Sequence, residues 1–176
     1  HFIYLQNPVL KMLRVVFDTN VYGLLILEDI EAIKARILGD KEFIVYGAKI
    51  IRDELRDTPK DVKLRNASVR NLMLELYDKI TQGRRLESSN EVEKLALGFY
   101  IEYRKIGGIR PWHAISEDFR IVANACIHGM DIIVSEDFRT MTSTKAVEAY
   151  KRIALECNLR IPNFLEYKYI KNRYGF

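Results

Sequence analysis

A short apolar run that stops at an acidic residue constrains this chain more than any other stretch. Val15, Val16 and Phe17 form a run rich in β-branched residues, which is typical of a strand buried inside a sheet. The run ends at Asp18, and residues 21–27 follow it with a helical pattern. Asp18 is therefore expected where a central strand ends and a helix begins, the edge of an open α/β sheet at which ligands bind. An aspartate there could hold a cation, or it could simply cap the helix.

Length and composition fit a single domain, residues 1–176, that can bury its own core. Its two cysteines, Cys126 and Cys157, form no CxxC pair, so neither a zinc knuckle nor a disulfide scaffold is expected, and the cytoplasm is the expected location. No apolar run approaches the roughly 20 residues of a membrane span. The net charge of +4 is compatible with an anionic partner.

Both ends of the chain fall outside the alternating pattern of strands and helices. The sequence begins with His1 rather than methionine, so residues 1–11 are interpreted as an extension or a foreign addition, with Met12 a plausible natural start. Residues 165–176 form a basic, aromatic segment that is expected to be a mobile tail.

Predicted strands and helices alternate along the rest of the chain. Strands are predicted over 15–17, 42–46, 130–135 and, at an edge of the sheet, 159–164. Helices are predicted over 21–27, 28–38, 48–56, 60–80, 91–105, 116–128 and 144–157. Residues 81–90 are expected to be a polar connection, with Asn90 capping the next helix. The alternation predicts the α/β class with a mainly parallel sheet.

Acidic residues fall at the edge where the strands of such a sheet end. Asp18 ends the first strand, Asp137 follows the 130–135 strand, and Asp118 lies in the first turn of the helix before it. Because like charges repel, a cluster of carboxylates needs a cation. Oxygen ligands suit Mg²⁺ or Mn²⁺, which can activate water and neutralise charge on a phosphoryl group. The pattern therefore favours phosphodiester hydrolysis, and no Ser-His-Asp or Cys-His pattern supports acyl chemistry.

Four motifs together resemble the PIN-domain family of metal-dependent nucleases: residues 16–20, 51–55, 118–125 and 133–138. The resemblance implies a three-layer α/β/α sandwich with a mainly parallel central sheet, and a Mg²⁺- or Mn²⁺-dependent ribonuclease that cleaves single-stranded RNA. It also implies the roles of individual residues. The metal ligands and catalytic acids would be Asp18, Glu54, Asp118 and Asp137, and the residues supporting them would be Asn20 and Ser135.

The same resemblance leaves two biological roles open. One is the toxin of a toxin–antitoxin pair, VapC-like, with an antitoxin partner and a homodimer; the other is an RNA-processing nuclease. The chain is longer than the small toxins, mainly between residues 59 and 105 and beyond 159. A catalytically inactive RNA-binding or assembly module is the alternative, although all four motif acids are present. A haloacid-dehalogenase-type phosphatase is discounted because Asn20 stands where its second aspartate would be.

Several other polar residues have two interpretations. Phosphate contacts could come from Arg84, Arg85, Arg139, Lys145, Lys168, Lys171 and Arg173. The tail aromatics could stack on bases, or they could dock on the domain or on a second subunit. Basic residues within 60–70 are expected on a solvated helix face. Glu117 and Glu136 are expected to be surface carboxylates, and Asp53 or Asp57 could equally be solvated neighbours of Glu54.

Overall fold

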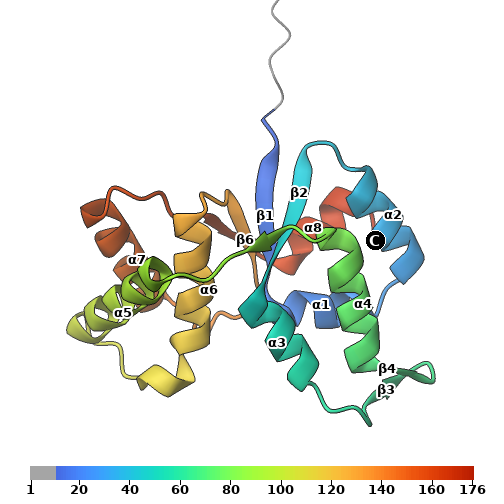
Figure 1. Cartoon of the computed structure of the whole chain (residues 1–176), viewed down its shortest axis with the longest axis horizontal. Coiled ribbons are helices and arrows are strands. Elements are labelled where there is room, and N and C mark those ends of the chain that lie inside the picture. Colours follow the sequence, from blue (N-terminus) through green and yellow to red (C-terminus); the bar gives the residue numbers. More distant parts are fainter. Residues whose placement is uncertain (1–10) are drawn as a thin grey trace, which may run out of the picture.

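Five parallel strands form the central layer of the computed structural model, which describes residues 11–176 (Figure 1). Their order across the sheet is β5-β2-β1-β6-β7. The strands are β1 (Leu13–Phe17), β2 (Phe43–Ala48), β5 (Arg85–Leu86), β6 (Ile132–Val134) and β7 (Asn163–Leu165). Because all the pairs are parallel, every strand ends at the same edge, and the predicted α/β class is confirmed.

The apolar run that dominates the sequence is the centre of this sheet. Val15 pairs with Val45 on one side and with Ile132 on the other. Val15, Val16 and Phe17 are all buried. A strand with neighbours on both sides and helices on both faces has no solvated positions, which explains the unbroken apolar run.

Helices cover both faces of the sheet, so the fold is the predicted three-layer sandwich (Figure 1). One layer consists of α5 (Asn90–Lys105), α6 (Ser116–Ile127) and α7 (Thr144–Glu156). The other consists of α1 (Thr19–Leu25), α2 (Ile30–Gly39), α3 (Lys49–Asp57), α4 (Val69–Thr81) and α8 (Tyr167–Tyr174). A short 3₁₀ helix, η1 (Trp112–Ala114), precedes α6. No helix within residues 11–176 has the length and apolar character needed to cross a membrane.

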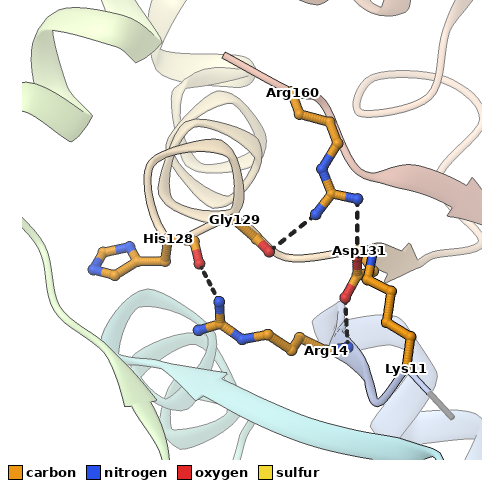
Figure 2. Close-up of polar contacts among 6 residues, drawn as sticks. All are labelled: Lys11, Arg14, His128, Gly129, Asp131 and Arg160. Carbon is orange, nitrogen blue, oxygen red and sulfur yellow. Dashed lines mark hydrogen bonds and ion pairs between the residues drawn. The ribbon is translucent and has the colours of Figure 1, made fainter. Parts of the chain in front are cut away.

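Polar side chains around Asp131, here called the polar clamp, hold together the edge of the sheet at which the strands start (Figure 2). This edge is opposite the one at which the strands end. The buried Asp131 carboxylate accepts hydrogen bonds from Lys11 Nζ at 3.1 Å, Arg14 N at 2.9 Å and Arg160 Nη1 at 2.8 Å. Burial alone would raise the pKa of Asp131, but these hydrogen bonds hold it below its ordinary value. The clamp fixes the starts of β1 and β6 relative to the loop before β7.

The predicted long helix over residues 60–80 is wrong for residues 60–68. Helix α4 begins only at Val69, and the preceding residues form a two-stranded hairpin of β3 (Lys63–Leu64) and β4 (Ala67–Ser68). At its tip Arg65 and Asn66 adopt positive φ angles of 50° and 65°. Two consecutive left-handed residues make the tight turn that matches the twist of a hairpin and cannot continue a helix. The basic residues before Val69 therefore belong to this hairpin arm rather than to a helix face.

The polar connection predicted over 81–90 contains a strand. Residues Arg85 and Leu86 form β5, which pairs with the end of β2. The predicted cap is also displaced by one residue: Ser89 accepts the hydrogen bond from Val92 N at 3.3 Å, and Asn90 is already helical. A two-residue strand shows no alternation from which a sequence could predict it.

The basic, aromatic segment at the C-terminus is a docked helix rather than an extended tail. In α8, Ile170 and Tyr174 are buried against the domain. Arg173 donates to both carboxylate oxygens of Asp40, at 2.6 and 3.0 Å, and its guanidinium lies 4.9 Å from the centre of the Phe43 ring. Of the residues 1–11 interpreted as an extension or addition, 1–10 lie outside the described residues, and Lys11 donates to Asp131.

Candidate active site

Asp18 stands at the end of β1 and at the N-cap of α1, so both interpretations of this residue have a structural basis. Its Oδ1 accepts from Thr19 N at 2.7 Å, as a cap would. Its Oδ2 accepts from Asn20 Nδ2 at 2.8 Å and from Ser135 Oγ at 2.7 Å. Asp18 is only 5% exposed, and this burial raises the pKa of its carboxyl group in spite of the three hydrogen bonds. The side chain thus caps one helix and is also held across the sheet edge to β6.

Asp137 lies in the loop that follows β6. Its Oδ1 accepts from the backbone N–H groups of Arg139 at 2.9 Å and Thr140 at 2.8 Å, and Thr140 Oγ1 also donates to Oδ2. The Asp137 N–H itself donates to Ser135 Oγ at 3.0 Å. The hydroxyl of Ser135 therefore connects the two aspartates that end neighbouring strands.

Glu54 and Asp118 come to this edge from opposite layers, on α3 and α6. The Thr19 hydroxyl donates to Glu54. Burial, together with the neighbouring carboxyl group of Glu117, raises the pKa of Glu54 to about 8. Burial likewise raises the pKa of Asp118 to about 7, and the charges of Asp137 and Asp18 add to the shift. Both groups therefore hold protons that exposed carboxyl groups would have lost at neutral pH.

An open cleft of about 550 Å³ brings the predicted acids together between α3 and α6. Its walls include all four predicted carboxylates, Asp18, Glu54, Asp118 and Asp137, together with Asn20. The four motifs, separated by up to 119 positions between Asp18 and Asp137, thus converge on one surface. The strand ends bring in the aspartates of β1 and β6, and the two helices close the cleft from either side.

The charge of this cleft is not balanced by basic side chains. Within residues 11–176, none of the four carboxylates forms an ion pair with Lys, Arg or His. Carboxylates that raise one another's pKa values, placed beside amide and hydroxyl oxygens, have the chemistry of a hard divalent cation site.

The acids are nevertheless not grouped as a finished metal centre. Across the described chain, no three His, Cys, Asp or Glu side chains lie in an arrangement that could hold a metal ion. Glu54 and Asp137 are instead bonded to threonine hydroxyls, and Asp18 to Ser135 and Asn20. The donor set fits a Mg²⁺ or Mn²⁺ ion in kind, while these side chains are placed to hydrogen-bond one another.

Four of the residues predicted to contact phosphates have other partners. Arg84 donates to the carbonyl oxygens of Val45 and Ile80, at 3.1 and 3.0 Å. Lys145 donates to Gly107 O, Lys171 pairs with Glu28, and Arg173 pairs with Asp40. The remaining three, Arg85, Arg139 and Lys168, are exposed and form no ion pair within residues 11–176. For the C-terminal aromatics, docking on the domain is the arrangement observed.

Two residues that the sequence predicts to be surface carboxylates have specific partners or positions. Glu117 is exposed, but it lines the cleft beside Glu54. Glu136 accepts a hydrogen bond from Tyr167 N at 2.5 Å and so holds the start of α8. The neighbours of Glu54 differ from each other: Asp53 pairs with Lys49 and Arg56, whereas Asp57 lines the cleft.

Sequence reasoning also missed two hydroxyls, those of Thr19 and Thr140, which bond Glu54 and Asp137. Thr19 follows Asp18 directly, but its partner is 35 positions away, so only the fold reveals the contact.

Comparisons with known proteins give the fold and little more. No family model matches the chain, and no curated protein does. Among solved structures, the chain is similar to a chain in the crystal structure of VapBC2 from Rickettsia felis bound to a DNA fragment from their promoter. The TM-score is 0.53 and the identity 15%, over 88% of this chain and 97% of the other. This likeness shows that the two chains share an α/β fold over nearly their whole length.

Proposed function

We propose that this chain is a PIN-like nuclease, an endoribonuclease that cleaves single-stranded RNA with Mg²⁺ or Mn²⁺. The observation that carries the proposal is the convergence of Asp18, Glu54, Asp118 and Asp137 on one cleft without a basic partner within residues 11–176. The likeness to a chain of the VapBC2 structure supports a fold of this kind.

In this proposal the four carboxylates would hold the metal, with Asn20 and Ser135 orienting Asp18 through their hydrogen bonds. A divalent ion bound there would supply an activated water and neutralise charge on the phosphate. The threonine hydroxyls hold Glu54 and Asp137 in place, and the raised pKa values of Glu54 and Asp118 mean that cation binding competes with protons.

The biological setting is a further part of the proposal. Because VapBC2 is solved bound to a DNA fragment from their promoter, we propose an antitoxin partner for this chain. A homodimer is proposed along with it.

One observation favours a second candidate, a catalytically inactive RNA-binding or assembly module. Within the described residues the acids are not preassembled into a metal-binding group. An inactive module would keep the cleft without binding the cation tightly.

The test is metal-dependent cleavage of single-stranded RNA by purified protein. We expect cleavage with Mg²⁺ or Mn²⁺ and none with EDTA. Glu54→Gln and Asp118→Asn should each abolish it. Asp53→Asn is the matched control, because Asp53 lies on the same helix and is engaged with Lys49 and Arg56. Cleavage that persists in chelator, or equal loss in the control, contradicts the nuclease proposal. RNA binding without cleavage under any metal supports the inactive module.

A further inference from the structure

A second hollow lies behind the loop that carries Asp137. It has a volume of about 430 Å³, and α7, β7 and the loop after β6 form its walls. Asp137 lines the cleft of the four carboxylates, and Asp137 and Thr140 also line a smaller hollow that shares Glu54 and Asp118 with it. Phe138 and Thr142, in the same loop, line this pocket instead. The loop is therefore a partition with the candidate active site on one side and the pocket on the other.

Hydrogen bonds link the wall of the pocket to the acidic residues of the cleft. Ser135 lies in the pocket wall, and its hydroxyl donates to Asp18 Oδ2 at 2.7 Å. The N–H and the hydroxyl of Thr142 both donate to the carbonyl oxygen of Asp137, at 3.0 and 2.8 Å. A polymer whose phosphate lay in the cleft would therefore have its neighbouring unit beside this pocket.

Two aromatic rings give the pocket a surface for a flat ligand. Phe138 is 52% exposed although it is a large apolar side chain. Phe164, in β7, also lines the pocket and is half-buried. Exposed aromatic rings beside a nucleic-acid path are stacking platforms for bases.

The open edge of β7 adds polar groups. β7 is the last strand of the sheet among the described residues. Two hydrogen bonds run toward β6. The Asn163 N–H donates to Asp131 O at 2.9 Å, and the Leu165 carbonyl accepts from Ser135 N at 3.0 Å. Because donors and acceptors alternate along a strand, the N–H and C=O of Phe164 point to the open side. They can bond the edge of a base.

One lysine and one glutamate, Lys151 and Glu166, line the pocket, and an arginine, Arg139, follows Phe138 in the loop. Neither the lysine nor the arginine forms an ion pair within residues 11–176. Cations beside an aromatic platform favour a ligand that combines a base with a phosphate.

We propose that this pocket binds one base of single-stranded RNA, the neighbour of the phosphate that lies in the carboxylate cleft. The proposal rests on the proposed function for the identity of the ligand. The pocket would then determine which base stands next to the cleaved bond.

The test measures RNA affinity separately from cleavage. Binding of four fluorescein-labelled homopolymeric RNA oligonucleotides is followed by anisotropy in EDTA, which stops metal-dependent cleavage. Phe138→Ala should weaken binding by about tenfold, the effect of losing one stacked base, and Phe138→Trp should preserve it. Lys151→Ala should weaken binding at low salt and flatten its salt dependence. Leu97→Ala is the matched control, because Leu97 is 48% exposed on α5.

A direct readout comes from Phe138→Trp combined with Trp112→Phe, which leaves one tryptophan at the pocket. RNA should quench its fluorescence if a base stacks on it. The pocket proposal is overturned if RNA binds without quenching this fluorescence and Phe138→Ala binds RNA as tightly as the wild type. This holds whether or not the protein cleaves RNA. A change of oligomeric state in Phe138→Ala, with RNA affinity unchanged, overturns it too, because the pocket would then be a contact between two copies. If the wild type cleaves no RNA but Phe138→Ala still weakens binding, the nuclease proposal fails and the base pocket stands.

Discussion

The hydroxyl of Ser135 donates to Asp18 Oδ2 at 2.7 Å and accepts from Asp137 N at 3.0 Å. One side chain thereby fixes the distance between the ends of β1 and β6. It also stabilises the charged form of Asp18, whose pKa burial would otherwise raise further. Ser135 is thus a positioning residue for the proposed site.

Ser135→Ala should shift the pH dependence of cleavage. Without the hydroxyl, the pKa of Asp18 rises, so a higher pH is needed to ionise it. We expect lower cleavage rates at pH 7 and partial recovery toward pH 9, measured as a pH–rate profile with Mn²⁺. An equal loss at every pH would mean that Ser135 acts on stability alone.

The metal-free protein should lose stability as pH rises from about 5 to 8. The pKa of Glu54 is raised to about 8 and that of Asp118 to about 7, so over this range the folded state still holds protons that the unfolded state has already released. Carboxyl groups with lowered pKa values, such as those of Asp40 and Asp131, favour the folded state as pH rises, but their effect is complete by about pH 5.

Thermal denaturation in EDTA at a series of pH values measures this slope. Each kcal/mol lost should lower Tm by roughly 2–4 °C in a chain of this size. Mn²⁺ should raise Tm more at pH 8 than at pH 6, because the ligands must be deprotonated. Glu54→Gln should flatten the slope in EDTA. A Tm that rises steadily from pH 5 to 8 in the wild type would contradict the raised pKa values.

Asp18→Asn separates the cap from the cation site. The change removes a buried charge and keeps an oxygen that can accept from Thr19 N. Since Asn caps as well as Asp, we expect the Tm in EDTA to stay within about 3 °C or to rise, equivalent to about 1 kcal/mol. Cleavage and the Mn²⁺-dependent rise in Tm should both be lost. A large fall in Tm with the Mn²⁺ effect intact would make Asp18 a structural residue only.

Removing residues 167–176 should destabilise the fold. Ile170 is fully buried, Tyr174 is buried and donates to Asp40 Oδ2 at 3.0 Å, and Arg173 binds the same carboxylate. Losing a single buried side chain of this size costs about 2–5 kcal/mol. We expect Tm to fall by more than 5 °C, whereas Lys168→Ala, at an exposed position of the same helix, should leave it nearly unchanged. An unchanged Tm in the truncated protein would mean that α8 is not part of the folded core.

Gly47→Ala should be severe, while Gly39→Ala should be mild. A Cβ at Gly47 would lie 2.0 Å from the Tyr77 hydroxyl oxygen and 2.5 Å from its Cζ, and that hydroxyl donates to Ala48 O at 3.1 Å. The ring must move and break the hydrogen bond, which should cost about 1–3 kcal/mol or more. A Cβ at Gly39 meets nothing within 4 Å. Urea unfolding of both variants measures the difference, and equal midpoints would show that Tyr77 repacks freely.

The sequence by itself determined the central strand, the α/β class and the position of Asp18. Those features are local: the β-branched run of Val15 to Phe17 and the acid after it report burial and strand termination directly. The family-like motifs also identified four acids that lie in one cleft.

Only the tertiary structure decided how those acids are held and which basic residues stay available. Which hydroxyl faces Glu54, and whether Arg173 meets solvent or Asp40, depends on how α3, α1 and α8 cross one another, and no periodicity encodes that. The same holds for β5 and the Arg65–Asn66 turn, because two-residue strands and left-handed residues leave no repeating pattern. The pocket behind Phe138 exists because α7, β7 and the loop after β6 meet there, three segments that are separate in the chain.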